Sequence, residues 1–239
     1  MVTGETGDLR EVITQARCVL FDFDGPICRL FAGYSADKVA KELVDWLTAQ
    51  GLLGLLTQAE SDDPDPHVVL RTVDVRHPGS DLVTELEEIL TQHELRAVPL
   101  ARPTPYADPL IRTWTAVGVR LAVTTNNSAL VAGRYLESRG LTECFARHVY
   151  GRTRDLRRMK PDPHCLNQAL TAMGARPADA LMIGDTVSDL LAADSAGVPF
   201  VGYAPDERRD KVLRAAGAQY LVSSLEPLLG FLRARRGDR

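Results

Sequence analysis

Two acidic residues close the first apolar run of the chain. Residues 18–21, Cys-Val-Leu-Phe, predict a short buried strand, and Asp22 and Asp24 follow it directly. Two carboxylates at the end of a buried strand are costly unless a positive charge lies between them. Gly25 and Pro26 then turn the chain away. Ligands bind at the carboxyl ends of strands in open α/β sheets, so this position favours acidic chemistry. A turn whose carboxylates bond nearby backbone amides would give the same pattern.

A second acidic pair follows a later apolar run. Residues 180–183 predict a buried strand, Asp185 comes just after it, and Asp189 lies one helical turn further on. If this strand neighbours the first, Asp22, Asp24 and Asp185 converge. Converging carboxylates repel one another unless a divalent cation or protons intervene, and a few protein oxygens with open positions suit Mg²⁺. The alternative for Asp185 is a helix N-cap.

Two further segments could bind an anion at the same edge of the sheet. Lys160 lies in a loop with Pro161 and Pro163, where it would offset nearby negative charge and hold an anionic ligand. Thr125 and Asn126 follow an apolar run and precede a helix, so their side chains and the helix amides could form an anion-binding cup. An exposed lysine and simple helix capping are the alternatives.

Strand-like runs alternate with single helices over most of the chain, which predicts an α/β fold. Each run is short and apolar, as in a parallel sheet covered on both faces, so we expect a Rossmann-like, doubly wound parallel sheet. The strands are expected at 18–21, 119–123, 148–150, 180–183, 198–203 and 220–222. The polar segment 1–10 is expected to be frayed, and the tail 233–239 is expected to be a solvated, mobile end.

One long segment has helical periodicity only. Residues 28–100 carry apolar residues at helical spacing and no strand pattern, with helices expected at 35–50, at 67–74 and from Ser80 or Asp81. We therefore expect an inserted all-helical cap domain at 28–102 and a core domain formed by 11–27 and 103–232. The segment Arg29–Phe31 and Pro103 are expected to act as hinges between them.

Composition narrows the class of protein. The chain has 239 residues, of which 45% are hydrophobic and 25% are charged, as in an ordinary soluble globular protein. Its net charge is −4, so nothing in the charge suggests a general nucleic-acid or anionic membrane surface. No apolar run reaches the ~18–20 residues of a membrane span. The four cysteines are too scattered for a usual zinc site, so we expect reduced thiols in a cytoplasmic protein that binds neither membrane nor nucleic acid.

Four ordered motifs of this chain resemble those of the haloacid dehalogenase (HAD) superfamily, in its phosphoglycolate phosphatase and β-phosphoglucomutase-like branch. The motifs are Asp22-Phe-Asp24-Gly, Thr125-Asn126, Lys160-Pro-Asp-Pro and Gly184-Asp-x-x-x-Asp189. The resemblance covers residues 17–222, including a helical insertion where that family carries its C1 cap. It departs from the family at Pro26, where threonine is common.

The resemblance implies a catalytic group and a metal site. Asp22 would attack phosphorus and form an aspartyl-phosphate, and Asp24 would act as general acid and then as general base. Mg²⁺ would be held by Asp22, the backbone carbonyl of Asp24 and Asp185, and Asp189 would orient this metal set. Family members that are dehalogenases lack the second carboxylate, so Asp24 favours phosphate chemistry.

The resemblance also implies a substrate and its ligands. Thr125 and Lys160 would bind the phosphoryl oxygens of a small phosphorylated metabolite, with Asn126 and Arg29 as further substrate-binding candidates. Further candidates in the expected cap are polar or basic, although most such residues are surface groups: Tyr34, Arg71, Arg76 and His77. The basic run 152–160 is expected to form either a positive rim or a solvated loop.

We therefore expect a Mg²⁺-dependent phosphatase that is a monomer or a homodimer. Two alternatives stay open. A phosphomutase of the same superfamily would return the phosphoryl group to the substrate, and a non-catalytic HAD-fold binding or regulatory protein would show negligible turnover.

Overall fold

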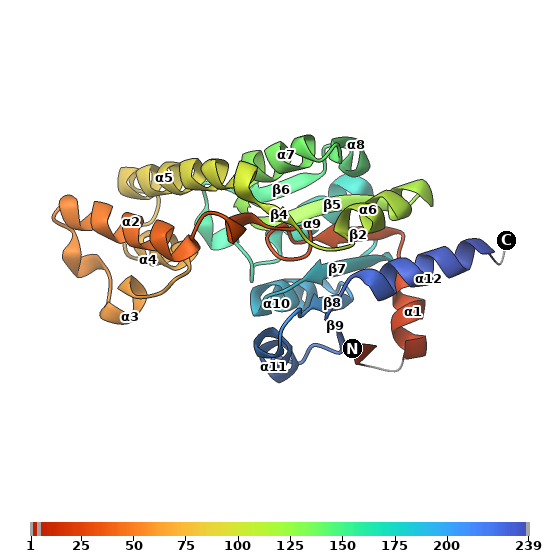
Figure 1. Ribbon diagram of the computed structural model, residues 1–239. Helices are drawn as coiled ribbons and strands as arrows, with labels where there is room; N and C mark the ends of the chain where they lie inside the picture. Colours follow the sequence, from red (N-terminus) through yellow and green to blue (C-terminus); the bar gives the residue numbers. More distant parts are fainter. Residues whose placement is uncertain (1, 4–5, 238–239) are drawn as a thin grey trace.

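The computed structural model describes residues 2–3 and 6–237, which form a sheet-based part and a helical part (Figure 1). The main sheet of these residues consists of β1 (Val2–Thr3), β2 (Cys18–Phe21), β5 (Arg120–Ser128), β6 (Val149–Arg152), β7 (Ala180–Gly184), β8 (Phe200–Tyr203) and β9 (Tyr220–Val222). Its order is β1-β9-β8-β7-β2-β5-β6. All neighbouring pairs are parallel except β1 and β9. The predicted α/β sheet is confirmed.

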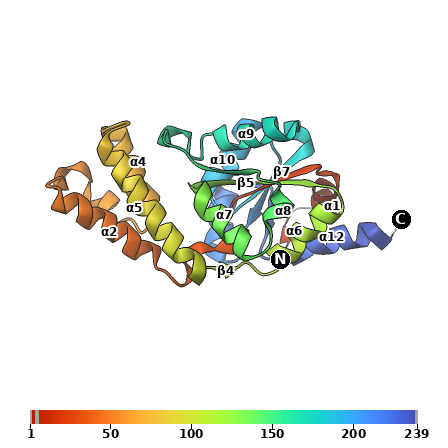
Figure 2. The same cartoon turned by 90° about the horizontal axis from the view of Figure 1, so that it is seen from above.

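Helices cover both faces of the sheet (Figure 2). One face carries α1 (Thr6–Gln15), α6 (Ala107–Ala116), α7 (Ala129–Ser138), α8 (Thr142–Phe145) and α12 (Glu226–Gly237). The other carries α9 (His164–Met173), α10 (Val187–Ala196) and α11 (Glu207–Ala215). The side chains of β2 alternate between these layers, with Val19 and Phe21 in one apolar cluster and Cys18 and Leu20 in the other. This two-sided burial explains why the strands read as continuous apolar runs.

The helical part contains α2 (Ala36–Ala49), α3 (Gln58–Ser61), α4 (Pro66–Arg76) and α5 (Asp81–Ala97). Its helices pack around an apolar cluster in which Leu43, Leu70 and Leu86 are fully buried, and Leu156 and Met159 of the sheet-based part join this cluster. Ser80 caps α5 by accepting the Val83 N–H, as its residue type predicts. The shorter 3₁₀ helices of the chain are Leu30–Ala32, Leu53–Leu55, Val98–Leu100, Leu156–Arg158 and Pro177–Asp179.

The two connections between the parts pair with each other. β3 (Cys28–Arg29) and β4 (Arg102–Pro103) form a short antiparallel ribbon where the chain leaves and re-enters the sheet-based part. The expectation that 28–100 is all helical is therefore wrong at β3. The ribbon arises because backbone groups of both crossings satisfy each other.

Both chain ends are more ordered than their polar composition predicts. Residues 6–10 begin α1, so the prediction of a frayed end is wrong for them. The tail is helical to Gly237, where α12 ends, and residues 233 and 234 are exposed, as expected of a solvated end. Residues 1, 4, 5, 238 and 239 lie outside the described part. Leu9 and Ile13 of α1 and Leu228 of α12 are fully buried in one apolar cluster. A few apolar side chains on one helical face suffice for such docking.

No helix in residues 2–3 and 6–237 has both the length and the apolar character needed to cross a membrane.

We predict that Ile13→Ala lowers the free energy of unfolding by about 2–5 kcal/mol, because it opens a cavity under α1. Urea unfolding of both proteins gives the difference. Glu11→Ala on the exposed face of the same helix is the matched control, with an expected change below about 0.5 kcal/mol. Equal midpoints for Ile13→Ala and the wild type would show that α1 is not part of the folded core.

Candidate active site

The register of the sheet brings the predicted residues to one edge. β2 lies between β5 and β7, and Phe21 at its end pairs with Val123 on one side and Ile183 on the other. Asp22 and Asp185 therefore leave neighbouring parallel strands at almost the same level. The predicted neighbourhood of the two acidic strand ends is confirmed.

Lys160 supplies the positive charge that the buried carboxylates require. Its Nζ lies 2.6 Å from Asp22 Oδ1 and 2.5 Å from Asp189 Oδ1, and it also donates to the Thr124 carbonyl at 2.8 Å. The lysine is only 1% exposed. Burial lowers its pKa, but the Asp189 and Asp22 carboxylates raise it more, so the pKa is raised and the amine is charged.

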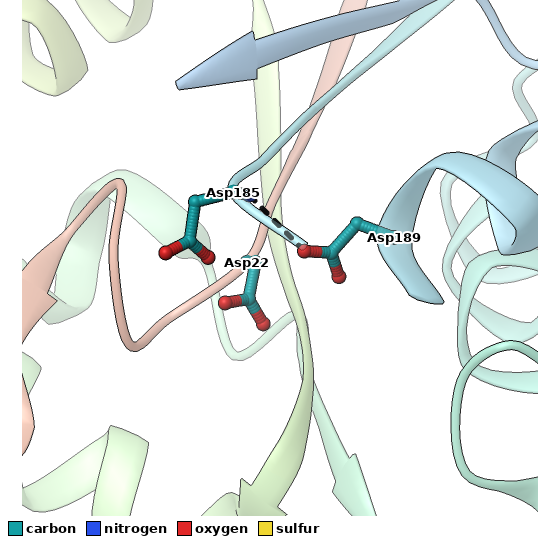
Figure 3. A group of neighbouring side chains, drawn as sticks. All are labelled: Asp22, Asp185 and Asp189. Atoms are coloured by element: carbon teal, nitrogen blue, oxygen red, sulfur yellow. Dashed lines mark hydrogen bonds between the residues drawn. The ribbon is translucent and has the colours of Figure 1, made fainter. Parts of the chain in front are cut away.

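Asp22, Asp185 and Asp189 form a compact group of carboxylates (Figure 3). One oxygen of each lies within 4.8 Å of the others, and all three residues are buried. Asp189 accepts the backbone N–H groups of Asp185 and Thr186 at 3.1 and 3.0 Å through Oδ2. The carboxylate that begins α10 thus fixes the turn that presents Asp185.

The charge of this group exceeds what Lys160 can offset. Burial and the neighbouring carboxylates raise the pKa of Asp185 well above its usual range, and burial raises the pKa of Asp22 to about 6. Asp185 Oδ1 is buried without a hydrogen-bond partner among the described residues, while its Oδ2 lies 3.1 Å from Arg209 Nε. Converging carboxylates with a free buried oxygen fit a divalent cation. Asp22 and Asp185 are the side chains best placed to hold one.

Two glycines leave room for these carboxylates. A Cβ on Gly25 would lie 2.4 Å from Asp185 Cγ, and a Cβ on Gly184 would lie 2.4 Å from Asp189 Cβ. Gly25 also has φ = +145°, a conformation that other residues rarely adopt. Both positions therefore require glycine for the acidic side chains to approach one another.

Asp24 lines the same cavity but is not part of the group formed by Asp22, Asp185 and Asp189. Its Oδ1 accepts the Leu30 N–H at 2.7 Å, at the start of the crossing toward the helical part. Burial raises its pKa to about 7, although the hydrogen bond from Leu30 acts in the opposite direction. A carboxyl group with this pKa can give and accept a proton near neutral pH.

Thr125 and Asn126 line the cavity from the last part of β5, which extends to Ser128 and not only to the expected residue 123. Thr125 Oγ1 donates to Asn127 Oδ1 at 3.1 Å and accepts the Asn127 N–H at 3.1 Å. The Asn126 amide bonds both the N–H and the carbonyl of Lys160. In this structure Asn126 therefore positions Lys160.

The cavity at this edge measures about 420 Å³, a size suited to a small molecule. Seven of the eight predicted site residues line it: Asp22, Asp24, Thr125, Asn126, Lys160, Asp185 and Asp189. The eighth, Arg29, is exposed on β3 and is not among the lining residues. Its role as a substrate ligand stays a prediction.

Of the four other candidates in the helical part, only Arg71 lines the cavity. Its Nη2 donates to the Lys160 carbonyl at 3.0 Å. Tyr34 instead bonds His93 at 2.8 Å, and Arg76 pairs with Glu60 at 2.9 Å. His77 is exposed at the end of α4.

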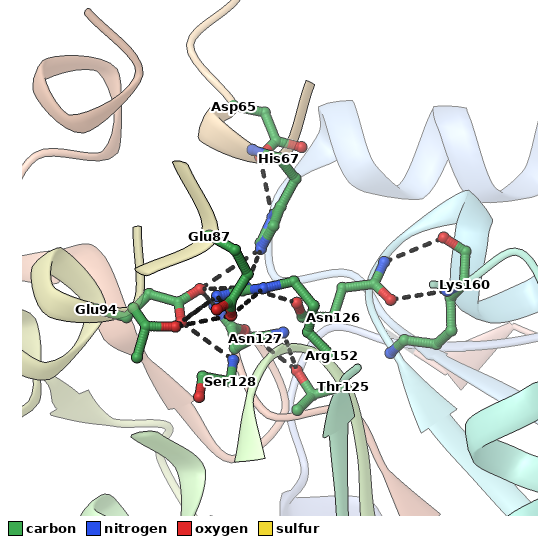
Figure 4. A network of polar contacts seen from close by, with 11 residues as sticks. Asp65, His67, Glu87, Glu94, Thr125, Asn126, Asn127, Ser128, Arg152 and Lys160 are labelled. Carbon is green, nitrogen blue, oxygen red and sulfur yellow. Dashed lines mark hydrogen bonds and ion pairs between the residues drawn. The ribbon is translucent and has the colours of Figure 1, made fainter. Parts of the chain in front are cut away.

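A network beside the cavity contains functional candidates that the sequence did not reveal (Figure 4). His67 lines the cavity, with Nδ1 3.2 Å from Asp65 and Nε2 3.5 Å from Glu94. Burial lowers the pKa of His67, but the two carboxylates raise it more. Arg152, expected on a rim or in a solvated loop, is buried and pairs with Glu94 at 3.0 Å. One feature of the sequence could have pointed to His67. The residues Asp65-Pro66-His67 are typical of a helix start, and such a start places the His67 ring close to the Asp65 carboxylate.

Comparisons with known proteins agree with this geometry. A phosphoglycolate phosphatase of Agrobacterium fabrum is 31% identical over 125 residues, which cover 52% of this chain and 53% of that protein. The match therefore spans about half the length of that relative. A phosphoglycolate phosphatase of Neisseria meningitidis is 26% identical over 198 residues, covering 81% of this chain and 83% of the relative.

A solved structure shares the fold. The crystal structure of a predicted phosphoglycolate phosphatase from Haemophilus somnus superposes with a TM-score of 0.64 at 17% identity, covering 94% of this chain and 99% of the other. The family model for the haloacid dehalogenase-like hydrolases matches residues 16–197, which contain every residue of the acidic group and Lys160. The chain belongs to the haloacid dehalogenase-like hydrolase family.

Proposed function

We propose that this protein is a Mg²⁺-dependent phosphatase that hydrolyses a small phosphorylated metabolite through an aspartyl-phosphate on Asp22. One observation carries the proposal. A buried carboxylate with Lys160 Nζ 2.6 Å away lies beside two further carboxylates in a cavity of about 420 Å³. A nucleophile, a cation for phosphoryl oxygens and an acidic group for a metal are thus within reach of one phosphate.

In the first step, a carboxylate oxygen of Asp22 attacks phosphorus and the bond from phosphorus to the leaving oxygen breaks. Asp24 gives its proton to that oxygen, which leaves as an alcohol. Lys160 and the Thr125 hydroxyl would hold the phosphoryl oxygens. A bound Mg²⁺, held by Asp22, Asp185 and the backbone carbonyl of Asp24, would supply charge compensation for these oxygens.

In the second step, Asp24 accepts a proton from a water molecule as that water attacks phosphorus. The bond between phosphorus and the Asp22 oxygen breaks, and inorganic phosphate leaves. The pKa of about 7 suits Asp24 to both directions of transfer. Asp189 would act through Lys160 and through the Asp185 turn, which it holds by hydrogen bonds.

We further propose that residues 28–102 form a cap that selects the substrate. Support comes from the apolar cluster centred on α2, α4 and α5, which only Leu156 and Met159 of the sheet-based part enter among its buried residues, and from the paired crossings β3 and β4. Arg71 and His67 face the cavity from this part, so a second anionic group on the substrate would find positive partners there. Two relatives are phosphoglycolate phosphatases, so 2-phosphoglycolate belongs in the first substrate panel.

We predict that Asp22→Asn lowers Mg²⁺-dependent phosphate release by about 1,000-fold or more, because the amide cannot act as the nucleophile. The measurement is phosphate release from a panel of phosphorylated metabolites and an aryl phosphate, with and without Mg²⁺. The variant keeps the size of the side chain, so it also serves as the control for contaminating phosphatases.

Three outcomes would contradict the proposal. Equal release by wild type and Asp22→Asn would mean that another group is the nucleophile or that a contaminant is active. Formation of a phosphate isomer without phosphate release would indicate a phosphomutase. Ligand binding with no turnover on any substrate would favour a binding or regulatory protein.

We predict that kcat/KM falls tenfold per pH unit above about pH 7, because Asp24 must be protonated to act as a general acid and its pKa is about 7. Asp24→Asn should lose this dependence and lower kcat/KM for an alkyl phosphate by about 10²–10⁴-fold. The kcat/KM for a nitrophenyl phosphate should fall much less, because its leaving group needs no proton and because kcat/KM does not include the later hydrolysis step in which Asp24 acts as a base. An equal fall in kcat/KM for both substrates would argue against the acid role.

We predict that Asp185→Asn raises the melting temperature of the metal-free protein by about 2–4 °C, which corresponds to about 1 kcal/mol for a chain of this size. The raised pKa of Asp185 means that its charge destabilises the folded state once pH rises above its unfolded pKa, so the gain is expected at pH 8 and not at pH 4. Thermal melts with and without Mg²⁺ test this. Mg²⁺ should stabilise the wild type and not the variant; an equal Mg²⁺ effect on both would place the metal elsewhere.

A further inference from the structure

A buried ion pair joins the helical part to the sheet-based part. Arg152 at the end of β6 and Glu94 in α5 lie 3.0 Å apart, and neither side chain has any exposed surface. Two more side chains of α5 hold the same guanidinium: Glu87 at 3.0 Å and the Thr91 hydroxyl at 2.9 Å. One arginine of the core is therefore enclosed by one helix of the proposed cap.

The Glu94 carboxylate also bonds the segment that carries Thr125. Its Oε1 accepts the Asn127 side-chain N–H at 2.9 Å, and its Oε2 accepts the Ser128 backbone N–H at 3.1 Å. The side-chain oxygen of Asn127, Oδ1, in turn accepts a hydrogen bond from the Thr125 hydroxyl at 3.1 Å. A continuous chain of hydrogen bonds thus runs from Glu94 through Asn127 to Thr125.

Arg152 holds the same segment from its other side. Its Nη1 donates to the Asn126 carbonyl at 3.0 Å. The Asn126 side chain then bonds both the N–H and the carbonyl of Lys160, at 2.7 and 3.1 Å. The backbone of the predicted phosphate-binding segment is therefore fixed between a carboxylate and a guanidinium, with Lys160 attached to it.

Stability alone is a poor reason for such a pair. Taking both charges out of water costs much of what their attraction returns, so apolar residues of similar volume often serve the fold as well. Burial acts to raise the pKa of Glu94, yet Arg152 and His67 lower it to about 2, so the carboxylate is charged. A charged pair with several bonds to one active-site segment is better explained by the geometry that it imposes.

We propose that Glu94 and Arg152 are positioning residues that hold the Thr125–Ser128 segment in its phosphate-binding conformation, so that one cap helix completes the phosphate site of the core. This inference rests on the proposed function, in which Thr125 and Lys160 bind phosphoryl oxygens. Neither residue is among those that line the cavity. Displacements on the order of 1 Å in such a segment lower catalytic rates by up to about 100-fold.

The test is Glu94→Gln, which keeps the shape of the side chain and removes its charge. Inorganic phosphate with Mg²⁺ is titrated into the folded protein by calorimetry, and amide hydrogen exchange is followed at Ser128. We expect the dissociation constant for phosphate to rise about tenfold or more, kcat to fall by a similar factor, and the Ser128 amide to exchange faster. The Mg²⁺ concentration for half-activation should stay within about twofold.

Glu88→Gln is the matched control. It makes the same chemical change on the same helix, but Glu88 is exposed and is not one of the α5 side chains that hold Arg152. It should leave phosphate binding within about twofold. Leu86→Ala, buried in the cluster of α2, α4 and α5, controls for loss of stability alone.

The double variant Glu94→Gln with Arg152→Met distinguishes a loss of phosphate binding caused by lost positioning from one caused by lost stability. It replaces the single variant in the test if Glu94→Gln does not fold. It removes the unpaired charge, so we expect it to recover thermal stability without recovering phosphate binding. Recovery of both, or wild-type phosphate binding by Glu94→Gln, would overturn the inference.

The two proposals fail in distinguishable ways. A wild type that binds phosphate but hydrolyses no substrate would overturn the proposed function, and Glu94→Gln would still test the positioning role through phosphate binding. A wild type that binds no phosphate would overturn both.

Discussion

The buried charge of Lys160 is the interaction on which the site depends. Its Nζ lies 2.6 Å from Asp22 and 2.5 Å from Asp189, so one buried positive charge offsets part of the negative charge that the fold gathers there. It leaves the third, Asp185, with a free buried oxygen. The folded protein thus holds an excess of negative charge at a fixed place. That excess is unfavourable for the fold by itself, and in our account a bound cation would compensate it.

The parallel sheet makes this arrangement possible by geometry alone. Neighbouring strands that run in one direction end at one edge, so β2, β5 and β7 bring Asp22, Thr125 and Asp185 to the same edge of the sheet. The helical part then closes over the same edge and contributes Arg71 to the cavity. In our account the sheet-based core supplies the catalytic residues, and the helical cap selects the substrate. The cap also contributes Glu94, which holds the phosphate-binding segment of the core in position.

The sequence predicted what depends on local pattern. Short apolar runs located most strands, and motif spacing located Asp22, Lys160 and Asp185. Prediction from the sequence failed where a segment far away in the chain determines the local structure. β5 continues through polar residues to Ser128 because β6 pairs with it there, and α12 docks through leucines that a charged tail obscured.

Arg152 shows most clearly what could not be predicted from the sequence. In the sequence it opens a basic run, and an arginine in such a run is usually solvated. Its burial depends on Glu94, 58 residues earlier in the chain and in a different part of the fold. No local pattern links the two residues, so their pairing, and the positioning role that we infer from it, became visible only in three dimensions.

The central claim is that Asp22 carries the phosphoryl group during turnover. The most direct test is to quench the enzyme with acid during turnover of its best substrate, reduce the acyl phosphate with borohydride, and map the modified residue by mass spectrometry of proteolytic peptides. Our account predicts that Asp22 is the reduced residue, that omission of Mg²⁺ prevents the modification, and that Asp22→Asn lacks it. Modification of a different residue, or full turnover with no phosphoryl group trapped on the protein, would contradict the account.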